Sequence, residues 1–118
     1  DGDLDIGVGH LDAPFSLLED RMRTEKWVGL DIVSADRVSV AGGSVLVESG
    51  ELKRRIPLLA GGSYLSVSDR RIVLALPDDA QNTVITVTWP NGSKRVLTGL
   101  EPNRYWKVGP QVTYSAVK

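Results

Sequence analysis

Apolar and polar residues alternate along most of the chain from residue 27 onward. In residues 84–89, Ile85, Val87 and Trp89 occupy every second position and would share one face of a strand. Residues 27–33 alternate in the same way. Strict alternation is typical of strands with one buried face, so the pattern predicts β-structure.

Short turn signals divide this region into about eight strands. Pro90-Asn91-Gly92 and Ser49-Gly50-Glu51 are such signals, because proline, asparagine and glycine favour turn conformations. The run Ile72 to Leu76 is apolar on both faces, which favours a buried central strand. Short strands at regular spacing predict an all-β fold, an antiparallel β-sandwich or open barrel. The expected strands are residues 27–33, 45–48, 52–56, 72–76, 84–89, 94–97, 105–108 and 112–117.

Residues 11–26 do not follow this alternation. Phe15, Leu18 and Met22 have the spacing of one helix face, whereas Phe15 to Leu18 also fits a short strand. Periodicity leaves both structures open for this segment.

Three carboxylates alternate at the start of the sequence, at Asp1, Asp3 and Asp5. Carboxylates at alternate positions of a turn can converge on calcium, which prefers oxygen ligands. The same residues also fit an acidic turn that leads into a strand. They are candidate metal ligands of an incomplete loop.

The composition is that of one soluble domain. The chain has 118 residues, a formal net charge of -1 and no cysteine. A length of this order suits one compact core, and the charge does not favour binding to nucleic acid or to an anionic membrane. No apolar run approaches the length of a membrane span. The absence of cysteine excludes disulfides and thiolate chemistry but leaves the compartment open.

The segment Ala60 to Arg71 is the densest run of glycine, hydroxyl groups and charge, and it connects two apolar runs. It lacks the lysine and the following helix of a phosphate-binding loop. It also lacks a Gly-x-Ser-x-Gly nucleophile motif. We expect its glycines to shape the backbone and four side chains to make contacts with a partner: Tyr64, Ser66, Asp69 and Arg70.

Catalytic residues are not evident in the sequence. His10 is the single histidine and has no obvious partner, which favours a surface position. Adjacent carboxylates such as Asp78-Asp79 diverge on a strand, whereas an acid/base pair must converge. We therefore expect a protein that is not an enzyme and has no cofactor of its own.

The aromatic residues allow two interpretations. Trp27 and Trp89 border apolar runs, which favours places in the core. Exposed rings could instead stack on a polysaccharide, so a carbohydrate-binding module is the alternative function.

Two motifs resemble the ASPIC/UnbV domain, a module that follows FG-GAP (integrin-α-like propeller) repeats in secreted and surface proteins. The first runs from Gly61 to Ser66 and continues through Ser68-Asp69 into residues 72–76. The second is the strand 84–87 that leads into Trp89-Pro90-Asn91-Gly92. Together with Trp27-Val28-Gly29-Leu30, the resemblance covers residues 27–109. Departures from the family pattern lie at residues 34–39 and 67–71.

The resemblance implies a domain organisation and a location. Residues 1–26 resemble the tail of an FG-GAP propeller repeat, in which aspartates bind calcium, and residues 27–118 form the ASPIC/UnbV-like β-sandwich. The expected setting is extracellular, periplasmic or at the cell surface. The expected partners are propeller repeats of the same chain or another surface protein, and the family has no established enzymatic activity.

Overall fold

The chain folds into strands only. The computed structural model describes residues 5–21, 26–34, 39–62, 64–65, 68–77, 82–111 and 113–115. Within these residues there are ten strands and no α-helix, so the predicted all-β class is confirmed. The strands are β1 (Ile6–Val8), β2 (Ser16–Leu18), β3 (Trp27–Ile32), β4 (Ser44–Ser49), β5 (Leu52–Pro57), β6 (Ile72–Ala75), β7 (Val84–Thr88), β8 (Lys94–Thr98), β9 (Arg104–Val108) and β10 (Thr113–Ser115).

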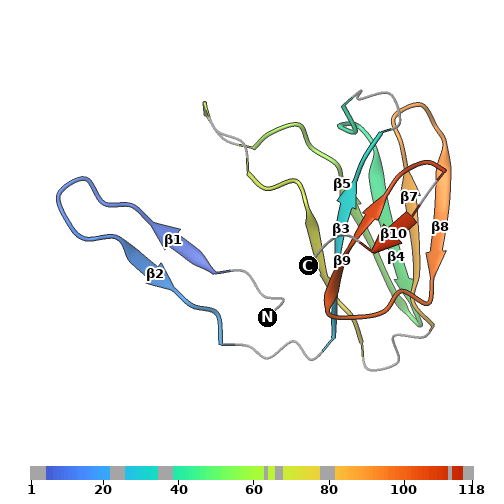
Figure 1. Ribbon diagram of the computed structural model, residues 1–118, viewed down its shortest axis with the longest axis horizontal. Helices are drawn as coiled ribbons and strands as arrows, with labels where there is room; N and C mark the ends of the chain where they lie inside the picture. Colours follow the sequence, from blue (N-terminus) through green and yellow to red (C-terminus); the bar gives the residue numbers. More distant parts are fainter. Residues whose placement is uncertain are drawn as a thin grey trace.

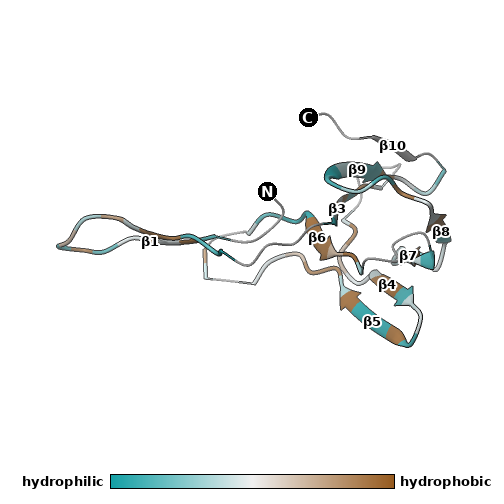
Figure 2. Ribbon diagram, turned by 90° about the horizontal axis from the view of Figure 1, so that it is seen from below, coloured by the Kyte–Doolittle hydropathy of each residue, from teal (hydrophilic) through white to brown (hydrophobic). Residues whose placement is uncertain are grey.

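Eight of these strands form a two-layer sandwich. One sheet has the order β10-β9-β3-β6 and the other the order β5-β4-β7-β8. Figure 2 shows the two sheets facing one another, with β5 near β6 at one side and β8 near β9 at the other. The sandwich is not wholly antiparallel, because β3 and β9 run parallel, with Gly29 opposite Tyr105.

The core lies between the sheets and follows the predicted alternation. Val28, Leu30 and Ile32 of β3 are buried, and residues of β4 and β7 meet them from the other sheet. The full set of buried apolar residues is Val28, Leu30, Ile32, Val45, Val47, Leu58, Leu74, Ile85, Val87, Trp89, Leu97 and Val108.

The residues after β7 form the turn that Pro90-Asn91-Gly92 predicts. The peptide N–H of Gly92 donates to the carbonyl of Trp89 at 2.9 Å, and Gly92 has a φ of 84°, which glycine adopts without strain. The side-chain oxygen of Asn91 accepts from the peptide N–H of Ser93 at 3.0 Å. This turn fixes the register in which β7 pairs with β8.

The position of β6 corrects one prediction. Its apolar run favoured a central strand, yet β6 is an edge strand that pairs only with β3 among the described strands. The spacing of apolar residues indicates which faces of a strand are covered. It does not indicate whether another strand pairs with each of its edges.

The segment around residues 11–26 contains a strand and not a helix in its described part. β1 and β2 form an antiparallel hairpin in which Ile6 lies opposite Leu18. Figure 1 shows this hairpin extending away from the sandwich, where it is joined to no other sheet. No helix long and apolar enough to cross a membrane occurs in the part of the chain that the structure describes.

Candidate functional site

A pocket of about 290 Å³ opens at the end of the sandwich where β5 leads into β6. Its apolar floor includes Ile32 and Ile72 from one sheet and Leu58, which directly follows β5 of the other sheet. Its polar rim comes from the connection between β5 and β6. The lining residues are Ile32, Val40, Pro57, Leu58, Leu59, Ala60, Gly61, Gly62, Ser68, Asp69, Arg70, Arg71 and Ile72.

The structure places two of the four predicted contact residues at this pocket. Asp69 and Arg70 line its rim. Tyr64 is 89% exposed and does not line the pocket, and Ser66 lies outside the described residues. Of the segment singled out by composition, the described residues 60–62 and 68–71 line the cavity.

The rim is fixed by a contact between Asp69 and Arg71. The carboxylate of Asp69 accepts hydrogen bonds from the peptide N–H of Arg71 at 2.9 Å and from its Nε at 2.8 Å. The guanidinium carbon of Arg71 lies 4.6 Å from the ring centroid of Tyr105. Cation–π contacts of this kind favour a fixed guanidinium position.

Tyr105 in turn rests on the sheet. A Cβ atom built on Gly29 would lie 2.0 Å from the Tyr105 ring, so the ring packs directly against the glycine backbone of β3. Trp27 meets the same ring edge-on, with 5.2 Å between centroids. Gly29, Tyr105, Arg71 and Asp69 thus form a continuous series of contacts from the sheet to the pocket rim.

This contact shifts the ionisation of both charged groups. Hydrogen bonds from Arg71 lower the pKa of Asp69, and the carboxylate of Asp69 raises the pKa of Arg71. Both groups are open to solvent, where screening weakens the interaction. The two pKa shifts indicate that the side chains are hydrogen-bonded, and they add little to the stability of the fold.

We expect the Asp69–Arg71 contact to open only below the ordinary range of an aspartate pKa. Because the pKa of Asp69 is lowered by folding, the pair is intact above the ordinary aspartate range and is lost as the pH falls through the lowered value. The Nε–H signal of Arg71 in ¹H–¹⁵N spectra should shift with a midpoint below that of an unpaired aspartate. Asp69→Asn should remove this titration, and a midpoint at the ordinary aspartate value would contradict the contact.

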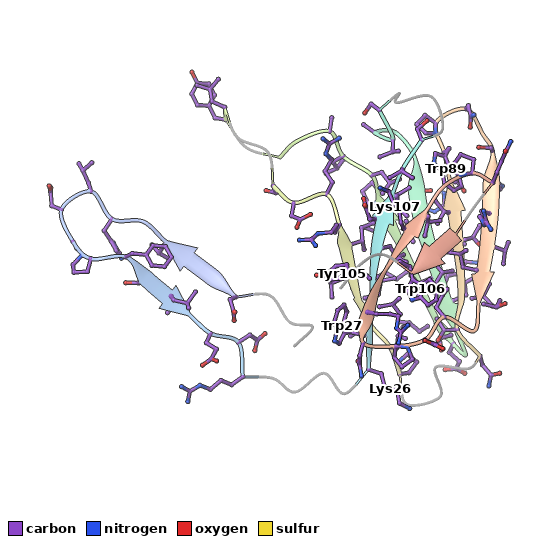
Figure 3. All side chains as sticks on the ribbon, in the orientation of Figure 1. Lys26, Trp27, Trp89, Tyr105, Trp106 and Lys107 are labelled. Carbon is purple, nitrogen blue, oxygen red and sulfur yellow. The ribbon has the colours of Figure 1, made fainter. Side chains whose placement is uncertain are left out.

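The tryptophans occupy different environments, as Figure 3 shows for Trp27, Trp89 and Trp106. Trp89 is buried, as predicted, and its Nε1 donates to the carbonyl of Val33 at 3.0 Å. Trp27 is not in the core; it lies half-buried against Tyr105, on the face of β3 opposite to Val28. Tyr105 has its stacking partners within the protein, which leaves its ring less available to a sugar.

The predicted metal ligands are placed only in part. Asp1 and Asp3 lie outside the described residues. Asp5 accepts a hydrogen bond from the peptide N–H of Asp20 at 3.0 Å, which links the two ends of the hairpin. Over the described ranges, no cluster of three or more acidic, histidine or cysteine side chains could hold a metal ion.

His10 lies on the exposed hairpin, as predicted, with its Nε2 3.1 Å from the hydroxyl of Ser16. No described carboxylate forms an ion pair with it. The contact closes the loop between β1 and β2.

The protein is a small all-β module. It consists of an eight-stranded sandwich with a pocket at one end and a hairpin that projects from it. The model of the family described as ASPIC and UnbV matches residues 35–115, which is more than half of the chain. The chain therefore belongs to the ASPIC and UnbV family. Searches of curated proteins and of solved structures gave no significant match.

Sequence reasoning missed Gly29, Tyr105 and Arg71, which support the pocket rim. One signal was present: Gly29 interrupts an apolar strand, and glycine inside a strand often marks a close approach by another group. The parallel pairing of β3 with β9, which brings Tyr105 onto that glycine, has no local signal.

Proposed function

We propose that the chain is a non-catalytic accessory module that docks on a calcium-binding FG-GAP propeller, or on another surface protein, outside the cell. Membership of the ASPIC and UnbV family supports an accessory role. Calcium would be a ligand of the propeller and not of the sandwich.

The exposed apolar surface of the β1–β2 hairpin is the observation that carries this proposal. Half of the large apolar side chains that are exposed in the described residues belong to this short hairpin and its loop. They are Ile6, Leu11, Phe15, Leu17 and Leu18. Apolar surface gathered in this way marks an interaction site.

The hairpin also lacks the partners that a stable sheet needs. β1 pairs only with β2 among the described strands, and neither packs in the core of the sandwich. A two-stranded hairpin by itself is marginally stable in water, and three or more strands or a covering surface are needed. Addition to a propeller blade would supply both the third strand and the cover.

Hydrogen exchange tests whether the hairpin is incomplete. In the 118-residue chain alone, we expect amides of β1 and β2 to exchange at least about 100-fold faster than those of β4 and β7, because unsupported hairpins open often. Equal protection in the hairpin and in β7 would show that the hairpin is complete without a partner.

A matched pair of variants tests docking itself. Leu11→Ser with Leu17→Ser should abolish binding to a propeller produced from the same gene, measured by calorimetry. Leu52→Ser, which removes an exposed apolar side chain from the sandwich, should leave that binding unchanged. Reading the gene upstream of the codon for Asp1 tests the architecture, and an absence of aspartate-rich repeats there would remove the propeller and calcium from the proposal.

A further inference from the structure

We propose that the free edge of β6 and the adjoining pocket bind an extended peptide segment of a partner protein. An apolar side chain of the peptide enters the pocket, and a carboxylate two residues away pairs with Arg70. This inference rests on the proposed role as an interaction module, but it uses a surface separate from the hairpin.

The edge of β6 away from β3 pairs with no strand in the part of the chain that the structure describes. The peptide N–H of Leu76 donates to the carbonyl of Lys26 at 2.8 Å, and Leu74 and Ile72 lie two and four residues before it, opposite Val28 and Leu30. Hydrogen-bonded and non-hydrogen-bonded pairs alternate in an antiparallel ladder. The N–H and C=O groups of Val73 and Ala75 therefore point away from β3.

The edge of β6 also lacks the usual protection against strand addition. Natural sheet edges carry charged residues or proline that discourage pairing with another chain. β5, at the same side of the sandwich, has Lys53, Arg54, Arg55 and Pro57, and β8 has Lys94 and Arg95. β6 has the sequence Ile-Val-Leu-Ala, without charge or proline.

The pocket lies where a side chain of an added strand would point. Residues directly opposite one another in paired strands direct their side chains to the same face of the sheet. Ile72 packs against the core and lines the pocket. A peptide residue opposite Ile72 would therefore direct its side chain toward the pocket floor formed with Ile32 and Leu58.

The pocket's size and charge define the peptide's chemistry. Pockets for small molecules span about 300–1,000 Å³, so about 290 Å³ suits an aliphatic or aromatic side chain better than a whole cofactor. Asp69 and Arg71 bind one another at the rim. Arg70 forms no ion pair with any described carboxylate and so is the cation available to a ligand.

Selection from a random peptide library tests this inference. A displayed library of dodecapeptides, panned on the immobilised chain, should enrich sequences with an apolar residue two positions from Asp or Glu. Binding of the enriched peptide is then measured by fluorescence anisotropy. If the enriched peptides lack an apolar residue two positions from Asp or Glu, the proposal is overturned.

Two variants test separately the charge of Arg70 and the backbone edge of β6. Arg70→Glu should weaken binding about tenfold or more, because a hydrogen-bonded charge pair is lost. Val73→Pro should weaken binding as strongly, because proline removes an outward N–H without touching the ladder to β3. Arg54→Glu on β5 is the control and should bind normally, and thermal melting checks that each variant is folded.

Other occupants would give different results. Unchanged affinity in both Arg70→Glu and Val73→Pro would overturn the proposal. So would a concentration-dependent dimer that Val73→Pro abolishes, which would assign the edge to a second copy of the chain. Displacement of the peptide by octanoate at equal affinity would assign the pocket to a small carboxylate. Hairpin variants leave all these readouts unchanged, so failure here is distinct from failure of the propeller proposal.

Discussion

A chain that begins at residue 35, where the family match starts, is expected not to fold. That match omits β3, although β3 lies between β6 and β9 and pairs with both. Its loss would remove Val28, Leu30 and Ile32 from the core. Full burial of one such side chain contributes about 1.5–3 kcal/mol, so their combined loss is comparable with the total stability of a small domain, about 5–15 kcal/mol.

The matched control is a chain that begins at Met22, which lacks the hairpin and keeps β3. It should give dispersed amide signals and a cooperative urea transition, whereas the chain from residue 35 should give neither. Cooperative unfolding of the shorter chain would show that β3 is dispensable, and that the folding unit coincides with the family match.

Gly29→Ala is expected to destabilise the sandwich by about 1–3 kcal/mol, the usual cost of overpacking. The new methyl group would lie 2.0 Å from the ring of Tyr105. A shift of the ring would disturb its contacts with Trp27 and Arg71. Urea denaturation followed by tryptophan fluorescence measures the change in the free energy of unfolding.

A double-mutant cycle identifies the cause. In the background of Tyr105→Ala, the clash is absent, and Gly29→Ala should cost less than about 0.5 kcal/mol, because residues in contact are not additive. Gly9→Ala is the control, since a Cβ there meets nothing within 4 Å. An equal cost of Gly29→Ala in both backgrounds would show that Tyr105 does not pack on this glycine.

Side-chain patterns predicted a covered face of β7 but not the neighbours of β6. Alternation in residues 84–89 placed Ile85, Val87 and Trp89 on one face, and all three are buried, because a strand with one covered side must alternate. The apolar run of residues 72–76 misplaced β6 in the centre of a sheet, and the position of Trp27 at the border of an apolar run misplaced it in the core. Lateral pairing depends on backbone groups that every residue type carries, so side-chain patterns do not specify a strand's neighbours.

The candidate site was likewise predicted only in part from the sequence. Composition singled out residues 60–71, and Asp69 and Arg70 do line a pocket. The pocket exists because Ile32 of β3 and Leu58, which directly follows β5, close its floor, and Tyr105 of β9 contacts Arg71 at the rim. These contacts join residues that are distant in sequence.

The sequence by itself determined the all-β class, the shared face of Ile85, Val87 and Trp89, the turn at Asn91-Gly92 and the family. These features depend on local periodicity, on turn chemistry and on short motifs. Only the tertiary structure decided that β3 pairs in parallel with β9, that β6 is an edge strand among the described strands and that Arg70 borders a pocket beside it. Strand order is fixed by the packing of two sheets around one core, and that packing is a property of the whole chain.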